Sequence, residues 1–368
     1  MKFSRRVREI DISGIRRAFE AAGSDAINLG LGQPDFDTPA HIKDAAIRAI
    51  RDGFTGYTEN QGTLELREAI CEKFKRENRI DTTPDRVIVT AGASEALHIA
   101  LQAIIEPGDE VLIPDPGFVS YNALTLLAEG RPVSLPLSRD YTVTPEGMAE
   151  EIRPRTRAII INSPANPTGA VQREEEIRGI CELAEDHGLT IISDEVYEHL
   201  IYEGRHVSPA EYTEDVITIN ATSKTYAMTG WRIGYLTAPT EAIEEMVKIH
   251  QYAQACATSI SQKAALAALT GPQDSVREMR QEFKKRRSIL MNALREMKIE
   301  CRDPKGAFYA FPRIRNAEEV VKQLLQHGVI TTPGATFGKE GSEHIRLSYA
   351  TTQEEIEKAM NIMREVLK

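Results

Sequence analysis

The segment from Asn220 to Tyr235 holds a lysine and an arginine in a setting that suits covalent chemistry beside a phosphate. Lys224 lies among small and hydroxyl-bearing residues, and Arg232 follows eight positions later. A partly desolvated lysine has a lowered pKa, which frees its amine to act as a nucleophile. Hydroxyl groups and a guanidinium together favour phosphate binding. The alternative is an exposed loop lysine, because short motifs often match by chance.

Other polar residues follow apolar runs that predict strands. Asp194 comes after the run 190–193, Asn166 after 157–162, and Gly92 after 86–90. In a mainly parallel sheet, ligands bind beside the carboxyl ends of the strands. We therefore expect these residues and Lys224 to lie at one edge of a sheet.

Asp194 needs a partner if its strand end is buried, because an unpaired buried carboxylate is costly. A metal ion is one candidate, but no histidine or second carboxylate lies at metal-ligand spacing, since Glu195 is expected to point to the opposite side. A protonated heterocycle nitrogen is the better partner. Asn166 and Tyr197 would then bind a phenolate-type oxygen. With the amine of Lys224, these groups match the needs of pyridoxal 5′-phosphate, and no metal site is predicted.

From Ala40 onward, predicted strands and helices alternate along the chain. The apolar periodicity predicts strands at 86–90, 110–113, 131–135, 157–162, 190–193, 216–219 and 233–236. It predicts helices at 41–51, 64–78, 94–105, 173–187, 241–252, 259–269, 275–297, 317–327 and 352–367. Short βα units of this kind are typical of an α/β fold with a doubly wound, mainly parallel sheet.

We expect three parts along the chain. Residues 1–38 would form an arm with a short helix and part of a small domain, and residues 39–275 a large cofactor-binding domain. Residues 276–368 would form a bridging helix and the rest of a smaller α+β domain.

Composition narrows the class of protein. The 368-residue chain has a net charge of −10, which argues against a nucleic-acid partner. No apolar segment follows the basic N-terminal residues, and no apolar run approaches about 20 residues, so neither a secretory signal nor a membrane span is expected. The four cysteines are scattered, as in a reduced, cytoplasmic protein.

Four motifs together carry a resemblance to a known family. In chain order they are Asn162-Ser-Pro-Ala-Asn-Pro-Thr-Gly169, Ser193-Asp-Glu-Val-Tyr197, Ser223-Lys-Thr-Tyr-Ala-Met-Thr-Gly-Trp-Arg-Ile-Gly234 and Arg346-Leu-Ser-Tyr-Ala350. The sequence resembles the class I aminotransferases of fold-type I, in the aspartate and aromatic aminotransferase subgroup. The resemblance extends over essentially the whole chain, from Asn28 to the last helix.

The resemblance implies a role for each matching residue. The catalytic residues would be Lys224, which holds the cofactor and carries the proton, with Asp194 and Tyr197. The remaining cofactor contacts would come from Ala93, Ser94, Phe118, Asn166, Ser223 and Arg232, and, from the neighbouring subunit of a homodimer, Tyr57. The substrate α-carboxylate would bind to Arg346, Asn166 and the backbone of Gly32. At Phe118 relatives often carry a larger aromatic, so a core phenylalanine is the alternative there.

The implied reaction is amino transfer between an L-amino acid and a 2-oxo acid, with aspartate and 2-oxoglutarate favoured. An aromatic or broad-specificity enzyme is the alternative, because some relatives that use acidic substrates carry a lysine where this chain has Ser94. Elimination or racemisation at the same site also stays open. A non-catalytic regulator that binds the cofactor is the alternative from another class, disfavoured because residues 1–25 leave no room for a DNA-binding module.

Overall fold

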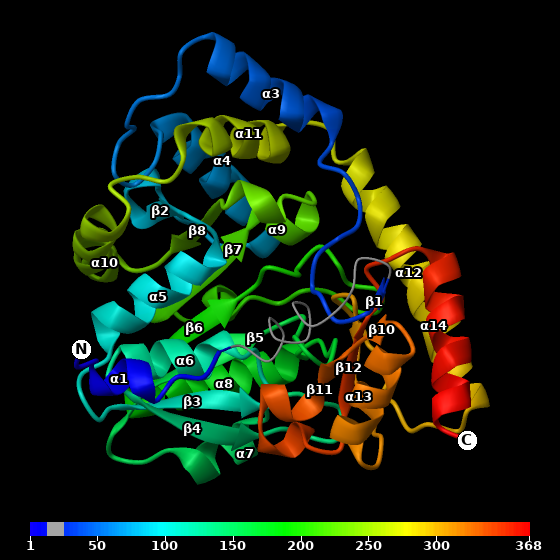
Figure 1. Ribbon diagram of the computed structural model, residues 1–368. Coiled ribbons are helices and arrows are strands. Elements are labelled where there is room, and N and C mark those ends of the chain that lie inside the picture. Colours follow the sequence, from blue (N-terminus) through cyan, green and yellow to red (C-terminus); the bar gives the residue numbers. More distant parts are fainter. Residues whose placement is uncertain (13–25) are drawn as a thin grey trace.

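A computed structural model describes residues 1–12 and 26–368, and its centre is a mainly parallel sheet (Figure 1). Within these residues, seven strands follow the order β2-β8-β7-β6-β5-β3-β4, and β8 is antiparallel to both of its neighbours. The strands are β2 (Val87–Thr90), β3 (Glu110–Asp115), β4 (Arg131–Pro136), β5 (Thr156–Asn162), β6 (Thr190–Asp194), β7 (Val216–Ala221) and β8 (Gly234–Thr237).

Helices cover both faces of this sheet. The helices of the described residues, three of which (α12 to α14) pack in the C-terminal part instead, are α1 (Arg5–Arg8), α3 (Ala40–Arg51), α4 (Leu64–Lys73), α5 (Ala93–Ile104), α6 (Ser120–Leu127), α7 (Pro145–Glu151), α8 (Glu174–His187), α9 (Thr222–Thr225), α10 (Thr240–Ala253), α11 (Ser259–Thr270), α12 (Asp274–Glu296), α13 (Ala317–Gln326) and α14 (Gln353–Val366). A π-helical turn, Phe74–Asn78, continues α4.

The alternation of side chains along a strand explains the two covered faces. On β5, Ala158 and Ile160 pack with α5 and α10, whereas Ile159 and Ile161 pack with α8. Strands buried on both faces are nearly continuous apolar runs, as in the Ala-Ile-Ile-Ile stretch of β5. The predicted α/β class with a doubly wound, mostly parallel sheet is confirmed.

The C-terminal part builds two smaller sheets around short strands. In the first, β12 (Ile345–Ser348) pairs antiparallel with β11 (Thr332–Pro333) and with β9 (Tyr309–Ala310). In the second, β1 (Ile27–Asn28) pairs parallel with β10 (Val329–Ile330), which joins an N-terminal segment to the C-terminal part. In Figure 1 the long helix α12 runs from the helices above the main sheet to the side of α14. The domain boundary near residue 275 stays a prediction.

Two expectations differ from the structure in detail. Between the strands predicted at 216–219 and 233–236, where the polar residues indicate a turn, the chain forms α9 and a 3₁₀ turn, Thr229–Trp231. The short helices α6 and α7 were not predicted, because each offers too few residues for a clear apolar period. The N-terminal helix expected within residues 1–23 falls largely outside the described residues, which show α1 there. No helix of the described chain has the length and apolar character to cross a membrane.

Candidate active site

A pocket of about 250 Å³ opens at the carboxyl ends of β3, β5, β6 and β7. Of the predicted site residues it gathers Gly32, Ala93, Ser94, Phe118, Asn166, Asp194, Tyr197, Ser223, Lys224, Arg232 and Arg346. Tyr57 does not line the pocket; it is 90% exposed on a loop between α3 and α4. Asn166, Asp194 and Lys224 thus meet at one edge of the sheet, as their positions after the predicted strands indicated.

Lys224 lies on the one-turn helix α9 directly after β7, so the strand delivers its side chain to the pocket. Its Nζ donates a hydrogen bond to the carbonyl of Gly32 at 2.6 Å. Burial, and then the positive charges of Arg346 and Arg232, lower the pKa of Lys224 to about 8, against a smaller opposing effect of Asp194. The amine is therefore neutral in a useful fraction of molecules near neutral pH, as a nucleophile or base requires.

Asp194 is the last residue of β6 and is buried. The hydroxyl of Tyr121 donates to its Oδ2 at 2.7 Å, and the backbone N–H of Val196 donates to Oδ1 at 3.4 Å. Burial raises the pKa of Asp194 to about 6, although the bond from Tyr121 opposes the shift. No cationic side chain among the described residues donates a hydrogen bond to this carboxylate. A cationic ligand atom would therefore be held strongly here.

Arg346 on β12 is almost fully buried and faces the same pocket. Its Nη1 donates to Oδ1 of Asn166 at 2.9 Å, and its Nη2 donates to the carbonyl of Gly30. The guanidinium carbon lies 4.6 Å from the ring centre of Tyr309 and 4.8 Å from that of Phe337. Its Nε is buried without a partner in the described residues. A carboxylate ligand could supply the missing acceptor.

The turn between β2 and α5 forms a second polar corner. Gly92 precedes α5 with φ +88°, and a Cβ there would lie 2.6 Å from Nη2 of Arg232. The guanidinium therefore lies directly against the turn. Backbone N–H groups at Ala93 and Ser94 have no partner within the helix, because they belong to its first turn. A helix N-terminus beside an arginine is a favourable anion site.

Tyr197 and Asn166 lie in the pocket as expected, but each already has a protein partner. The hydroxyl of Tyr197 shares a 2.7 Å hydrogen bond with the hydroxyl of Tyr309. A Cβ at Gly32 would approach the Tyr309 hydroxyl to 2.1 Å, so only glycine fits there. Contacts of Tyr197 and Asn166 to a cofactor stay predictions.

Sequence reasoning missed Tyr121 and Asn162. Tyr121 supports Asp194, and the ring of Phe118 packs edge-on against it with ring centres 5.5 Å apart. Asn162 donates from Nδ2 to the backbone carbonyl of Asp194 at 3.0 Å and accepts from the N–H of Asn166 at 2.9 Å. Asn162 begins one of the four motifs and Tyr121 lies three residues after Phe118, but which neighbour each side chain reaches depends on tertiary packing.

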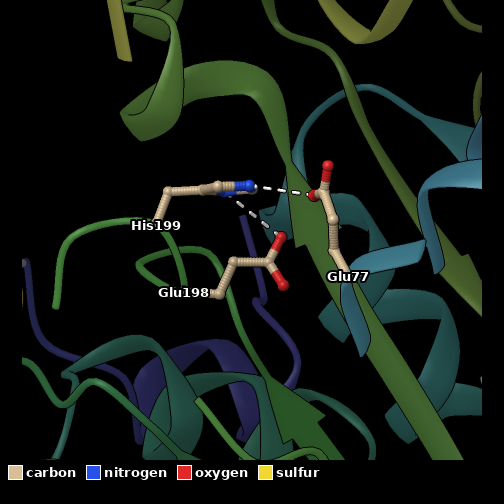
Figure 2. Close-up of side chains that lie close together, drawn as sticks. All are labelled: Glu77, Glu198 and His199. Atoms are coloured by element: carbon tan, nitrogen blue, oxygen red, sulfur yellow. Dashed lines mark hydrogen bonds and ion pairs between the residues drawn. The ribbon is translucent and has the colours of Figure 1, made fainter. Parts of the chain in front are cut away.

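A partly buried ion network lies next to the segment 193–199, and Figure 2 shows three of its residues, Glu77, Glu198 and His199. His199 Nε2 lies 3.0 Å from Glu77 Oε2, and His199 Nδ1 lies 3.4 Å from Glu198 Oε1. Two carboxylates and an imidazole suit a metal ion by type. However, the ammonium of Lys73 pairs with Glu198 and donates to Asn78 Oδ1 at 2.7 Å. That charge already balances Glu198 and would repel a divalent cation, so we interpret the network as structural.

Glu195 belongs to the same network and faces away from the pocket, as expected from its position next to Asp194. Its two oxygens accept hydrogen bonds from the hydroxyls of Ser193 and Ser208, from Asn78 Nδ2, and pair with His206 Nε2 at 2.8 Å. A carboxylate with this many partners is satisfied without a ligand.

Comparisons with known proteins support the family resemblance that the four motifs carry. The family model described as aminotransferase class I and II matches residues 24–363. The chain is 48% identical to the probable aspartate aminotransferase of Methanocaldococcus jannaschii, over 99% of both chains. It is 41% identical to aromatic-amino-acid aminotransferase 2 of Thermococcus litoralis, over 100% of this chain and 99% of that protein. A solved structure of aspartate aminotransferase from Thermus thermophilus with maleate matches over 100% of both chains, with 38% identity and a TM-score of 0.94.

Proposed function

Because the chain belongs to the class I and II aminotransferases and is a pyridoxal 5′-phosphate-dependent enzyme, we propose that it exchanges amino and oxo groups between an L-amino acid and a 2-oxo acid. Aspartate is the favoured donor and 2-oxoglutarate the favoured acceptor. The observation that carries the proposal is that Lys224, Asp194 and Arg346 meet in one pocket. This exchange needs a nucleophilic amine, a buried carboxylate and a carboxylate-binding guanidinium.

The residues present fit the cofactor. Asp194 is a buried carboxylate that lacks a cationic hydrogen-bond donor among the described residues, and a protonated pyridine nitrogen would supply one. The N-terminus of α5, Ser223 and Arg232 would hold the phosphate. Asn166 and Tyr197 would hydrogen-bond the ring oxygen, and Phe118 would stack on the ring.

The chain's own groups bind the substrate and move its proton. When bound, the cofactor supplies an electron-accepting ring that stabilises the charge left at Cα. Asp194, ionised, keeps the ring nitrogen protonated. Arg346 and Asn166 fix the α-carboxylate, which orients the Cα–H bond towards Lys224 Nζ. The neutral amine of Lys224 would then accept the Cα proton as a base and, once protonated, would serve as the acid of the reaction.

An aromatic donor is the second candidate. The relative in Thermococcus litoralis is named an aromatic-amino-acid aminotransferase, and Ser94 stands where some acidic-substrate relatives carry a lysine. Phe118 and Tyr309 give the pocket apolar surface that suits an aromatic side chain.

A panel of amino donors with 2-oxoglutarate tests the function and its substrate. We expect aspartate to give oxaloacetate and glutamate with the highest kcat/KM. A higher kcat/KM for an aromatic donor than for aspartate would favour the aromatic enzyme. Formation of an oxo acid with release of ammonia instead of glutamate, as in elimination, would contradict amino transfer. Conversion of the donors to D-amino acids would contradict it as well. No turnover with any donor would favour a cofactor-binding regulator.

We also propose a homodimer in which Tyr57 completes the partner's site. Tyr57 is 90% exposed although it is a large aromatic residue, and Ile47, Ile50 and Leu64 nearby in the sequence are also exposed. An exposed apolar group of this kind suits a protein–protein interface. Sedimentation analysis tests the assembly, and a monomer at micromolar concentration would contradict it.

A further inference from the structure

Asp115 has no role in the proposed mechanism, yet it is 7% exposed and lies close to the pocket. It is the last residue of β3, and the chain continues through Pro116 and Gly117 to Phe118, which lines the pocket. Its carboxylate therefore lies at the base of the loop that presents the ring-stacking phenylalanine.

The carboxylate accepts hydrogen bonds from two distant parts of the chain. On its own sheet, the hydroxyl of Ser134 donates to Oδ2 at 2.8 Å. From the C-terminal part, the backbone N–H of Lys339 donates to Oδ2 and that of Glu340 donates to Oδ1, both at 3.2 Å. A Cβ at Gly338 would meet Oδ1 at 1.9 Å, so the two segments pack as closely as glycine allows.

The C-terminal segment held in this way leads directly to Arg346. Residues 334–344 connect β11 to β12, and Figure 1 shows this part of the chain lying against the carboxyl end of β3. Phe337, within the segment, is stacked on the guanidinium of Arg346. The carbonyl of Phe337 also accepts a 2.8 Å hydrogen bond from the N–H of Gly117.

Two sides of the pocket are thus joined at one buried carboxylate. On one side, residues 115–118 carry the stacking phenylalanine. On the other, residues 337–340 support the face of Arg346. Side chains in a packed interior transmit small displacements, because there are few voids to absorb them. A change at Asp115 should therefore move the guanidinium relative to the ring-binding loop.

We propose that Asp115 is a positioning residue that sets the place of Arg346 and so determines the affinity of the enzyme for substrate α-carboxylates. This inference rests on the proposed function, in which Arg346 binds that carboxylate. Asp115 itself touches neither substrate nor cofactor. Its effect reaches the substrate through the backbone of residues 337–340 and the ring of Phe337.

The test is Asp115→Asn in the holoenzyme, which keeps the size of the side chain but turns an NH₂ group towards a backbone N–H. We expect KM to rise about tenfold for both the amino donor and the 2-oxo acceptor, because both carry the α-carboxylate. We expect kcat to change less than about twofold, since Lys224 and Asp194 are untouched. The dissociation constant of the cofactor, from its visible absorbance, should stay within about twofold of wild type.

Two comparisons separate positioning from general damage. Glu110→Gln changes a buried carboxylate at the other end of β3, far from the pocket, and should leave both KM values unchanged. In an Arg346→Gln background, Asp115→Asn should add no further rise in KM, because the effect acts through Arg346. If Asp115→Asn does not fold, Ser134→Ala, which removes one hydrogen bond of Asp115, should raise both KM values by a smaller factor.

Unchanged KM values in folded Asp115→Asn, or equal losses in the Glu110→Gln control, would overturn the inference. An additive effect in the Arg346→Gln background would overturn it as well. Absence of amino transfer by the wild-type enzyme would instead contradict the proposed function, so the two failures are distinguishable.

Discussion

At the scale of single residues, the pocket sets two pKa values in opposite directions. Burial lowers the pKa of Lys224 to about 8 and raises that of Asp194 to about 6. The same burial acts on both, because each group loses hydration of its charged form. In the folded protein an acid and a base thus titrate much closer to neutral pH than either does in water, as expected for groups that exchange protons near neutral pH.

The first prediction concerns stability of the cofactor-free protein. The folded pKa of Lys224 lies below its ordinary value of 10.5, so burial of its charge destabilises the fold at pH values below about 8. Above about pH 10.5 the amine is neutral in both states and the penalty is absent. The free energy of unfolding of the wild type, relative to that of Lys224→Met, should therefore increase by up to about 3 kcal/mol as the pH rises from 8 to 10.5. Urea unfolding of both proteins across this pH range measures the difference in free energy. A difference that does not change with pH would contradict the lowered pKa of Lys224.

A second prediction concerns Tyr121. In Tyr121→Phe the ring packing stays but Asp194 loses its shortest hydrogen bond, so the pKa of Asp194 should rise further. We expect kcat/KM to fall about tenfold or more, with a larger loss at pH 6 than at pH 8, because in the proposed mechanism only ionised Asp194 would hold the ring nitrogen protonated. Tyr226→Phe is the matched control, since its buried hydroxyl donates to Gln273 away from the pocket. An equal loss of kcat/KM in both variants would contradict the role of Tyr121 in holding the Asp194 carboxylate.

At the scale of elements, the sequence predicted the seven strands of the main sheet to within two residues at each end. Apolar runs bounded by polar turns give a strong local signal, and the site residues that follow them were predicted for the same reason. Phe118 and Gly32 also line the pocket as expected. What the sequence could not give were contacts between distant elements. The hydrogen bonds of Tyr121 to Asp194, of Tyr197 to Tyr309 and of Asp115 to residues 339–340 join segments at least 73 residues apart.

The turn between β2 and α5 supports a prediction at this scale. Alanine at Gly92 would adopt an unfavourable positive φ and would place its Cβ 2.6 Å from Arg232 Nη2. Displacing the arginine should raise the dissociation constant of the cofactor about tenfold or more. Gly53→Ala is the control, because Gly53 also has a positive φ, +73°, but a Cβ there meets no atom within 4 Å. A cofactor affinity in Gly92→Ala equal to that of the control would contradict the phosphate assignment.

At the scale of the whole molecule, the pocket lies where the main sheet and the C-terminal part of the chain meet. Asp194 ends β6 of the main sheet and Lys224 lies on α9 directly after β7, whereas Arg346 comes from β12 of the second part. Such a site depends on the placement of two bodies of structure, which explains why a buried carboxylate outside the pocket can influence substrate affinity. A sequence pattern alone could assign the residues to elements but not this placement.

Hybrid dimers test whether the assembly completes the site. In a mixture of Lys224→Ala and Tyr57→Ala chains, a heterodimer has one site with an intact lysine and an intact tyrosine from the partner. If Tyr57 binds the partner's phosphate, mixing should restore a fraction of sites with the cofactor affinity of wild type, which neither parent has. Cofactor titration of the re-equilibrated mixture measures this fraction. Cofactor affinities equal to the average of those of the two parent variants would contradict a contribution of Tyr57 to the partner's site.

The central claim is that Lys224 is the residue that holds the cofactor. Incubation with pyridoxal 5′-phosphate, reduction with borohydride and peptide mass analysis test it most directly. We expect one major adduct on the peptide that contains Lys224, with loss of the adduct, of the visible absorbance band and of nearly all turnover in Lys224→Ala. An adduct on a different lysine, or turnover unchanged in Lys224→Ala, would contradict it.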